Sequence, residues 1–259
     1  MERALQTNYG KMVRLGRLFK DGKTLIVAMD HGLESGVLTG LEKMRDAVKN
    51  VLVEGVDAVM VSFGAAKHIV DIIASKTNLI ITIPNDEKFV IEALKMGADA
   101  VKTTYFGEIP LSNEMLKTFS RIAVECEKFG LPYLIELVPV DHSGNVIYEM
   151  SKVTMAARIG AEIGGDFVKI PYTGSYDSYR KVVESCFIPT VIMGGPKVES
   201  EYDVLKWVED SVKAGGAGVA FGRNIWQHKT PSVMARAIGR ILHSGLSADE
   251  VLREMKTIR

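Results

Sequence analysis

A lysine inside an apolar segment is the residue of this sequence best suited to covalent chemistry. Lys169 lies between Val168 and Ile170 in the run FVKIPYTG, residues 167–174. Burial disfavours the ammonium form of lysine, so a desolvated side chain can become a free amine that attacks carbonyl groups. A structural role is the alternative, in which the side chain pairs with a carboxylate or extends to the rim of the fold.

Acid–base residues follow another apolar segment near the N-terminus. The run VAMDHG places Asp30 and His31 directly after the segment Leu25–Met29. A carboxylate and an imidazole in this position could move protons for a bound substrate. Asp30 could equally cap the segment that follows it.

Two glycine-rich segments in the C-terminal part predict an anion site. MGGPK contains Gly194 and Gly195, and FGRN contains Gly222 and Arg223. Glycines let backbone N–H groups approach a ligand closely, and arginine offers a planar fork of donors to phosphate oxygens. We therefore expect a phosphorylated substrate.

A second lysine repeats the surroundings of the first. Lys102 lies in AVKTTYFG, residues 100–107, which matches FVKIPYTG in the spacing of valine, lysine, tyrosine and glycine. Two ammonium groups at one cavity disfavour each other's charged form, which would help to keep one lysine nucleophilic. Alternatively, Lys102 faces the surrounding helices or pairs with Asp99 or Glu136.

The elements that must position these residues alternate along the chain. Short β-branched segments alternate with longer amphipathic ones, the pattern of βα units around a parallel sheet. Eight such units in 259 residues predict a single (β/α)8 TIM barrel. The predicted strands are Leu25–Met29, Ala58–Phe63, Leu79–Pro84, Ala100–Phe106, Tyr133–Pro139, Phe167–Tyr172, Thr190–Gly194 and Gly218–Phe221.

Amphipathic segments between the strands predict helices that end near glycine, among them Ser112–Phe129, Met150–Ile163 and Ser200–Ala214. An extra helix over about residues 5–20 could close the barrel floor, and Ser247–Lys256 predicts a C-terminal helix outside the ring. The sequence contains no linker or low-complexity segment, so we expect one domain over residues 1–259.

In such a barrel the chemistry takes place at the C-terminal ends of the strands. Asp30 and His31 close the first predicted strand, and the glycine pairs close the seventh and eighth, whose loops commonly bind phosphate. Lys102 and Lys169 lie on alternate strands, which contribute side chains to one interior layer. We therefore expect one site at this end, with His31 and Lys102 as further substrate-binding residues.

The composition argues against nucleic acid and membranes as binding partners. The 32 basic and 32 acidic residues balance, so no overall field favours nucleic acid or an anionic membrane. No apolar stretch is long enough for a membrane span and the N-terminus lacks a secretion signal, so we expect a cytoplasmic protein. Cys126 and Cys186 have no partner at metal-ligand spacing and are expected to be reduced thiols.

The motifs together resemble those of the archaeal-type class I fructose-bisphosphate aldolases, and of the related archaeal enzyme that condenses a keto sugar phosphate with aspartate semialdehyde. The matching stretches are VAMDHG, FVKIPYTG, VIMGGPK and GVAFGRNIWQ, which occur in the same order across nearly the whole chain. The resemblance implies a TIM barrel that acts on a phosphorylated sugar through a covalent lysine, without metal or separate cofactor. It also implies a homo-oligomer, and decamers built from pentameric rings occur in this family.

The resemblance also assigns roles by position. Lys169 is similar to the lysine that forms the Schiff base with the substrate ketone. Asp30 is similar to the aspartate that takes part in proton transfer around carbinolamine formation and C–C cleavage. The residues that match the phosphate cradle are Gly194, Gly195, Gly222 and Arg223.

Two departures from the family pattern bear on the reaction. The family's aldolases close the fifth strand with Tyr-Pro-Arg, whose tyrosine is the general acid/base, whereas this chain reads LVPVDHSG with Val138 in that place. The loop after the third strand, residues 85–87, is also short. Our first candidates for the missing acid/base are His142 and Tyr105; Tyr172, Asp141 and Glu136 are further possibilities.

Three functions follow as hypotheses. The first is a class I aldolase or transaldolase for a phosphorylated keto sugar, with a preference other than, or broader than, fructose 1,6-bisphosphate. The second is thiolase-like acetyl transfer to coenzyme A from a phosphorylated diketone, because a branch of the family with that activity also lacks the tyrosine. The third is a non-catalytic sugar-phosphate binding protein. We prefer the first, because a pure binder needs no buried lysine.

Overall fold

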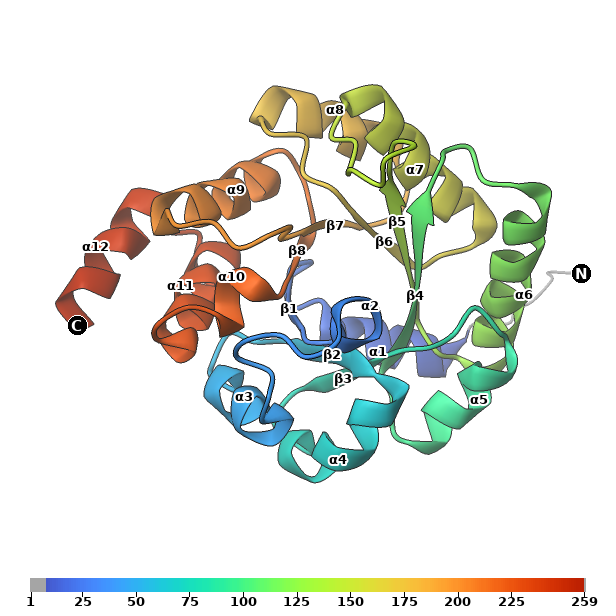
Figure 1. Cartoon of the computed structure of the whole chain (residues 1–259), viewed down its shortest axis with the longest axis horizontal. Helices are drawn as coiled ribbons and strands as arrows, with labels where there is room; N and C mark the ends of the chain where they lie inside the picture. The colour runs from blue at the N-terminus through green and yellow to red at the C-terminus, as the bar shows by residue number, and fades with distance from the viewer. Residues whose placement is uncertain (1–7, 259) are drawn as a thin grey trace, which may run out of the picture.

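The computed structural model describes residues 8–258, and its centre is a closed barrel of eight parallel strands arranged in chain order (Figure 1). Each strand pairs with the next, and the last pairs with the first through Leu25 and Val219. This architecture confirms the predicted TIM barrel. The strands are β1 (Thr24–Ala28), β2 (Ala58–Ser62), β3 (Asn78–Thr82), β4 (Ala100–Gly107), β5 (Tyr133–Pro139), β6 (Phe167–Ile170), β7 (Thr190–Met193) and β8 (Gly218–Phe221).

Helices connect successive strands and form a ring around the barrel (Figure 1). Every predicted strand and every helix named from the sequence is present, with ends that shift by one or two residues at most positions. The helices are α1 (Tyr9–Leu18), α2 (Gly32–Ser35), α3 (Met44–Val51), α4 (Phe63–Ile73), α5 (Lys88–Lys95), α6 (Asn113–Phe129), α7 (Met150–Ile163), α8 (Tyr176–Ser185), α9 (Glu201–Lys213), α10 (Arg223–Trp226), α11 (Pro231–Ser244) and α12 (Ala248–Ile258).

Side-chain caps explain several helix boundaries. The hydroxyls of Ser112 and Ser200 accept hydrogen bonds from backbone N–H groups in the first turns of α6 and α9. Both serines therefore stand just outside helices that the sequence pattern had included them in. At the other end, α6 and α7 stop at Gly130 and Gly164, which adopt the left-handed conformation that glycine tolerates.

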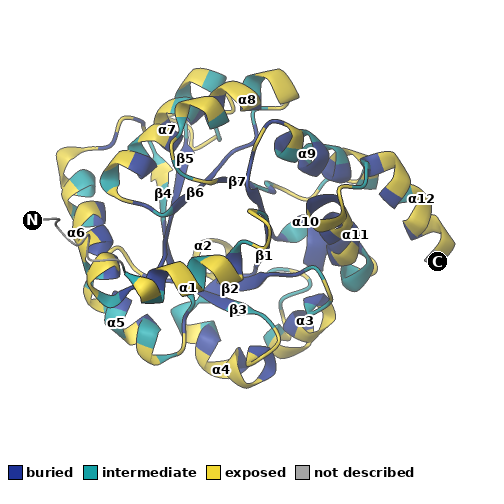
Figure 2. Ribbon diagram, turned by 180° about the vertical axis from the view of Figure 1, so that it is seen from behind, coloured by how far each residue is buried: buried dark blue, intermediate teal, exposed yellow. Residues whose placement is uncertain are grey.

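The strands separate two apolar cores. Side chains that point outward pack against the ring of helices, and those that point inward fill the barrel. Figure 2 shows the strands coloured as buried. The alternation follows from the two-residue period of a strand. The interior core consists of Leu18, Ile26, Ala28, Ala58, Met60, Ile80, Ala100, Leu134, Phe167, Val191 and Ala220.

Helix α1 closes the floor of the barrel, as the sequence predicted. Leu18 is fully buried in the interior core, and the ring of Phe19 meets that of Phe167 edge-on at 5.2 Å. Lys11 anchors the helix through Glu127 and Asp166. Figure 2 shows α1 across the end opposite to α2. Residues 5–7 of the predicted helix lie outside the described part of the chain.

Helix α12 packs against α9 and α11, outside the ring, which confirms the predicted C-terminal helix. Within residues 8–258, every helix is too short or too polar to span a bilayer.

Candidate active site

Four buried charged side chains meet inside the barrel, above its apolar filling. They are Asp30, Lys102, Glu136 and Lys169, with 7%, 1%, 3% and 6% of their surface exposed. Lys102 Nζ lies 2.7 Å from Asp30 Oδ2 and 2.5 Å from Glu136 Oε2, and Lys169 Nζ lies 2.5 Å from Glu136 Oε1. Glu136 thus bridges the two lysines. We call this group the charged quartet.

Strand geometry explains why these residues converge. On β5 and β6, Glu136 and Lys169 each come two positions after an interior apolar residue, so they point the same way, and they are direct register partners. Lys102 comes two positions after Ala100 on β4. Asp30 follows β1 and accepts a hydrogen bond from Thr82 Oγ1 at 2.6 Å.

Ion pairing, rather than burial, decides the direction of the pKa shifts of Asp30, Glu136 and Lys102. Burial alone would raise the pKa of Asp30 and Glu136, but Lys102 and Lys169 lower both pKa values below their ordinary range. Burial alone would lower the pKa of Lys102, yet its contacts with Asp30 and Glu136 raise it. The expectation that the two lysines depress each other is therefore wrong for Lys102. It is held as an ammonium because carboxylates, not another lysine, are its nearest charges.

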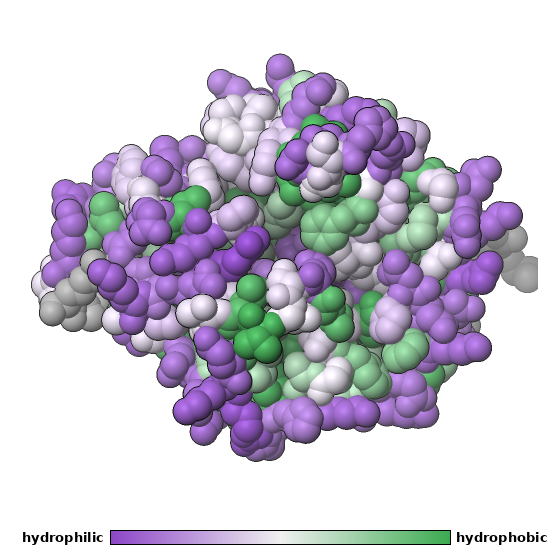
Figure 3. Space-filling view, in the orientation of Figure 1, coloured by the Kyte–Doolittle hydropathy of each residue, from purple (hydrophilic) through white to green (hydrophobic). Residues whose placement is uncertain are grey.

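A cavity of about 450 Å³ opens above the quartet at the C-terminal end of the barrel. It is lined by all four quartet residues and by every residue predicted for the phosphate cradle, so the structure brings these segments together. Figure 3 shows a hollow at the centre of this face, with hydrophobic side chains around it and a mainly hydrophilic outer edge. The predicted residues that line the cavity besides the quartet are His31, Gly194, Gly195, Gly222 and Arg223.

The side chain of Asn224 links the two segments of the phosphate cradle by hydrogen bonds. Asn224 donates a hydrogen bond to the carbonyl of Gly194 at 2.7 Å and accepts one from the N–H of Val198 at 3.0 Å. A Cβ on Gly222 would lie 2.7 Å from the carbonyl oxygen of Ala28, so only glycine fits there. Arg223 Nε is buried and has no hydrogen-bond partner among the described residues. An anion in the cavity would supply one.

His31 forms part of the cavity wall beside this cradle. Its ring packs edge-on against Trp226 at 5.5 Å and covers Gly222. Burial lowers the pKa of His31 from its ordinary value of 6.5 to about 4. Asp30 acts against this shift, and Lys169, Arg223 and Lys102 act in the same direction as burial. The imidazole is therefore neutral at pH 7, and its buried Nδ1 lacks a hydrogen-bond partner within residues 8–258.

The structure does not bring the two first candidates for the missing acid/base to the cavity. His142 is 94% exposed and pairs with Glu108 at 2.9 Å, because Asp141 folds the loop after β5 into a turn that points it to solvent. Tyr105 points away from the barrel interior and donates a hydrogen bond to the carbonyl of Glu108. The expectation that they line the main cavity is therefore not met, and their position gives no support to a catalytic role. Val138, at the position of the family's tyrosine, is fully buried.

Tyr172 lies in a neighbouring cavity of about 350 Å³. Trp207 also lines this second cavity, which shares Tyr148 and the segment from Met193 to Pro196 with the main cavity. Tyr148 belongs to the loop between β5 and α7, and its hydroxyl lies 3.8 Å from the position of a Cβ on Gly195. The tyrosine therefore stands where the two cavities meet.

Sequence reasoning missed cavity residues that come from the connections between strand and helix, among them two with side chains able to do chemistry. Glu34, on the short helix α2, and Tyr148 both line the main cavity. A strand pattern predicts which strand residues point inward, but not how a loop folds back over the barrel. Asn224 was also missed, although its place directly after Arg223 was a usable signal.

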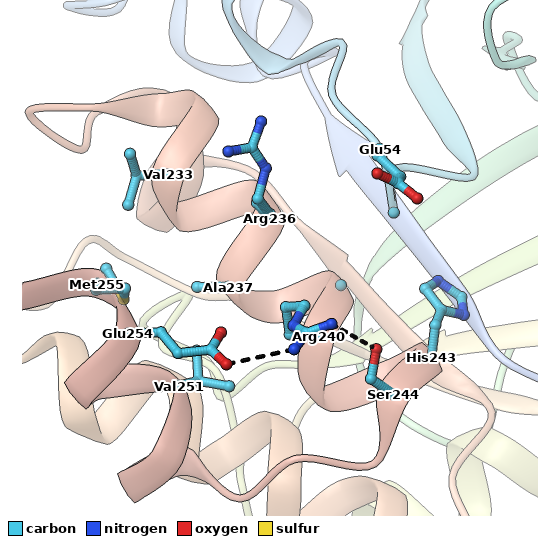
Figure 4. Close-up of a pocket in the computed structure, with 12 residues that line it drawn as sticks. Glu54, Val233, Arg236, Ala237, Arg240, His243, Ser244, Val251, Glu254 and Met255 are labelled. Atoms are coloured by element: carbon cyan, nitrogen blue, oxygen red, sulfur yellow. Dashed lines mark hydrogen bonds and ion pairs between the residues drawn. The ribbon is translucent and has the colours of Figure 1, made fainter. Parts of the chain in front are cut away.

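A separate cavity of about 310 Å³ lies between α11, α12 and the residues before β2 (Figure 4). Its walls combine apolar side chains such as Val251 and Met255 with Arg240, which pairs with Glu254 at 3.3 Å. None of the predicted site residues, all of which the structure describes, lines it. The cavity gives no support to a second catalytic centre.

No cluster of three or more histidine, cysteine, aspartate or glutamate side chains with the arrangement of a metal site occurs in residues 8–258. The two cysteines are free. The polar and charged groups that line the cavity include the quartet, His31, Glu34, Tyr148 and Arg223.

The fold and this site define a class: barrel proteins of the (β/α)8 type built around an interior lysine at the C-terminal end of the strands. Sequence comparison specifies the class further. Residues 24–228 match the DeoC/LacD family of aldolases, and the chain belongs to this family of class I enzymes.

Relatives in the sequence comparison match almost the whole chain. The 2-amino-3,7-dideoxy-D-threo-hept-6-ulosonate synthase 1 of Archaeoglobus fulgidus is 35% identical over 255 residues, which cover 94% of this chain and 95% of that protein. An aldolase of Saccharolobus solfataricus, described as uncharacterized, is 29% identical over 270 residues, covering 95% of this chain and 99% of that protein.

Solved structures agree with this assignment. A Schiff-base-forming fructose-1,6-bisphosphate aldolase is 30% identical with a TM-score of 0.79, covering 90% of this chain and 100% of that one. An archaeal fructose-1,6-bisphosphate aldolase whose catalytic lysine is covalently bound to the carbinolamine intermediate is 29% identical. It has a TM-score of 0.79 and covers 90% of this chain and 99% of that one.

Proposed function

We propose that this protein is a class I aldolase or transaldolase that makes or breaks a C–C bond in a phosphorylated keto sugar, with Lys169 as the Schiff-base residue. The observation that best supports this proposal is that the buried Lys169 and Arg223 line the same cavity. The guanidinium Nε of Arg223 is buried and has no hydrogen-bond partner among the described residues. The covalent lysine takes the place of a separate cofactor, and no metal enters the proposed chemistry.

The quartet supports the activation of Lys169. An ammonium must lose a proton before it attacks a ketone, and Glu136 Oε1 at 2.5 Å is the group placed to take that proton. Lys102 remains in contact with Glu136 and Asp30, so the site stays close to neutral when the proton moves. Asp30 is proposed to assist proton transfer around the carbinolamine, as the family resemblance implies.

The reaction then proceeds in balanced steps. The amine of Lys169 adds to the ketone carbon, and the resulting carbinolamine loses water to give an iminium ion. When the substrate C–C bond breaks, its electron pair flows into the iminium and leaves an enamine on Lys169, while the other fragment departs as an aldehyde. Protonation of the enamine carbon and addition of water release the second product and restore the lysine.

The phosphate end of the substrate is proposed to bind the backbone N–H groups of Gly194, Gly195 and Gly222 together with Arg223. Gly195 has a φ of 60°, a left-handed conformation that glycine tolerates. His31 and Lys102 contribute to the same binding surface. Because His31 is neutral, it adds hydrogen-bonding capacity to this wall without adding charge.

The structure favours a substrate other than, or broader than, fructose 1,6-bisphosphate. Val138 offers no acid/base group where the related aldolases have a tyrosine, and the loop before α5 is short. The similar proteins are named as fructose-bisphosphate aldolases and as an aminodideoxyheptulosonate synthase. We therefore choose the keto sugar phosphates to be tested from the substrate classes that these names indicate.

The test is product release from a panel of phosphorylated ketoses, measured as aldehyde and triose phosphate formed by the wild-type protein. Replacing Lys169→Met should lower the rate at least about 1,000-fold, because the covalent route is lost. Lys181→Met, which changes an exposed lysine of α8, is the matched control and should leave the rate unchanged. Equal rates for the Lys169 variant and the wild type would refute the proposal.

The two other hypotheses give different results in the same assay. Acetyl transfer would appear only when coenzyme A and a phosphorylated diketone are both present. A binding protein would retain the sugar phosphate but release no product.

A further inference from the structure

The proposed reaction needs a group that takes a proton from one carbon fragment and returns it to the other, and the two buried carboxylates are poorly suited to this role. Asp30 is fixed by Thr82 and Lys102, and Glu136 is shared between Lys102 and Lys169. Both are held in the ionised form by these contacts. A carboxylate held by a buried ammonium group, as Asp30 is, or by two, as Glu136 is, is a weak base for a substrate hydroxyl.

Glu34 is the cavity carboxyl group that is not committed to a partner. Within residues 8–258, no hydrogen bond or ion pair ties its side chain, although it lines the cavity together with the quartet. It lies on the four-residue helix α2, which follows Asp30 and His31 directly. Figure 1 shows α2 inside the ring of helices, beside β1, at the end opposite to α1.

The surroundings of Glu34 suit a group that changes its protonation. Glu34 as a whole is exposed at the cavity mouth, but desolvation of its carboxyl group raises its pKa from the ordinary value of 4.5. Glu136 and Asp30 also raise this pKa, whereas Lys102 and Lys169 lower it. The lysines and the acids of the quartet thus act on Glu34 in opposite directions, and no direct partner fixes its protonation within residues 8–258. A base with a raised pKa accepts and returns a proton more readily near neutral pH.

Resting on the proposed aldolase function, we propose that Glu34 is the general acid/base of this site. The Glu34 carboxylate takes the hydrogen from the hydroxyl on the carbon that becomes the aldehyde. The O–H electrons form the new C=O bond, and the electrons of the breaking C–C bond pass into the Lys169 iminium. The same proton then moves from Glu34 to the enamine carbon, so the carboxylate is regenerated.

The test separates Schiff-base formation from this proton transfer. Dihydroxyacetone phosphate is incubated with the protein in deuterated water; borohydride trapping followed by mass spectrometry measures the lysine adduct, and NMR measures deuterium uptake at the hydroxymethyl carbon. The wild type should show both. Glu34→Gln should still be trapped at Lys169, while deuterium uptake falls about 100-fold or more. Glu34→Asp should restore part of the uptake.

Glu108→Gln is the matched control, since Glu108 is an exposed rim carboxylate that pairs with His142 and does not line the cavity. It should exchange like the wild type. Wild-type exchange in Glu34→Gln would overturn the assignment, and loss of exchange in Tyr148→Phe alone would transfer the role to Tyr148. Loss of trapping in Glu34→Gln would also overturn it, because Glu34 would then act before the enamine. No adduct in the wild-type protein would contradict the aldolase function itself, and this inference with it.

Discussion

At the scale of single residues, each ionised group of the site is stabilised by an oppositely charged neighbour. Lys102 contacts two carboxylates and Glu136 contacts two lysines, so no member of the quartet is an isolated buried charge. Buried ion pairs seldom add much net stability, but breaking one leaves an uncompensated charge in a poorly solvated place. The quartet is therefore better explained by the chemistry proposed for Lys169 than by stability.

Replacing Lys102→Met tests this coupling. The change leaves Asp30 and Glu136 with one ammonium group between them, and it should lower the free energy of unfolding by about 3–5 kcal/mol in urea titrations. Lys95→Met, which breaks an exposed pair with Glu92, is the control and should leave the urea midpoint nearly unchanged. A midpoint for Lys102→Met as high as that of the control would show that the quartet is not coupled in this way.

The neutral state of His31 predicts a pH dependence of stability. Its pKa is about 4 in the folded protein and about 6.5 when unfolded, so the unfolded chain binds the extra proton between these values. Stability should therefore fall as the pH is lowered from about 6.5 toward 4, by up to about 3 kcal/mol from this residue.

Urea midpoints measured between pH 4.5 and 7 check this expectation. Asp30 and Glu136 have lowered pKa values, so their contribution to the free energy of unfolding is lost mainly at more acidic pH and does not obscure the effect of His31 in this window. His31→Gln should flatten the slope in this window. An unchanged slope in the variant would mean that His31 is not buried in its neutral form.

The sequence placed the lysines on the strands and several residues directly after the strands at this cavity, but it did not predict how Glu136 bridges the lysines or which loop residues fold over the site. Lys102 and Lys169 could be assigned to one interior layer because each lies in a short apolar run with strand periodicity. Their partner Glu136 was left open, since its contacts depend on the register between β4, β5 and β6, which no local pattern encodes. His142 was misplaced because the turn formed by Asp141 decides its direction.

At the scale of elements, the closure of the barrel depends on how β8 meets β1. Gly218 begins β8 with a φ of 142°, and a Cβ there would collide with the carbonyl oxygen of Thr24. Because the obstacle is backbone, it cannot move aside without shifting a strand. The alternation of β-branched and amphipathic segments was enough to predict every strand, but the need for glycine at this seam appears only once the strands are paired.

Gly218→Ala should destabilise the fold by at least about 1–3 kcal/mol from backbone strain alone, with a further cost for the displaced strand. Gly16→Ala is the matched control: Gly16 is exposed in α1 and a Cβ there meets nothing within 4 Å. It should stabilise the helix by about 0.5–1 kcal/mol. Thermal unfolding of both variants tests the contrast, and similar melting temperatures would contradict it.

At the scale of the whole molecule, the barrel has a sealed end and an open end. Helix α1 seals the floor with Leu18, while the charged quartet and the cavity occupy the opposite face. Stability and chemistry are thereby assigned to different ends, as is usual for this fold. A single domain over residues 1–259, a homo-oligomer and a cytoplasmic location remain predictions from the sequence.

Because the two ends are separate, we predict that a substitution in the barrel floor lowers the free energy of unfolding but leaves Schiff-base formation at the open end intact. Leu18→Ala should cost about 2–5 kcal/mol of unfolding free energy, because it opens a hole in the interior core. Met12→Ala, on the exposed side of α1, should cost little. Where the Leu18 variant is still folded, its borohydride adduct should form as in the wild type; loss of the adduct in the folded variant would mean that the two ends are coupled.

The most direct test of the central claim is to trap the protein with dihydroxyacetone phosphate and borohydride and to locate the adduct by peptide mass spectrometry. We predict one reduced adduct per chain, on Lys169, that disappears in Lys169→Ala. An adduct on Lys102, or none despite binding that inorganic phosphate competes away, would contradict the assignment of Lys169 as the Schiff-base residue.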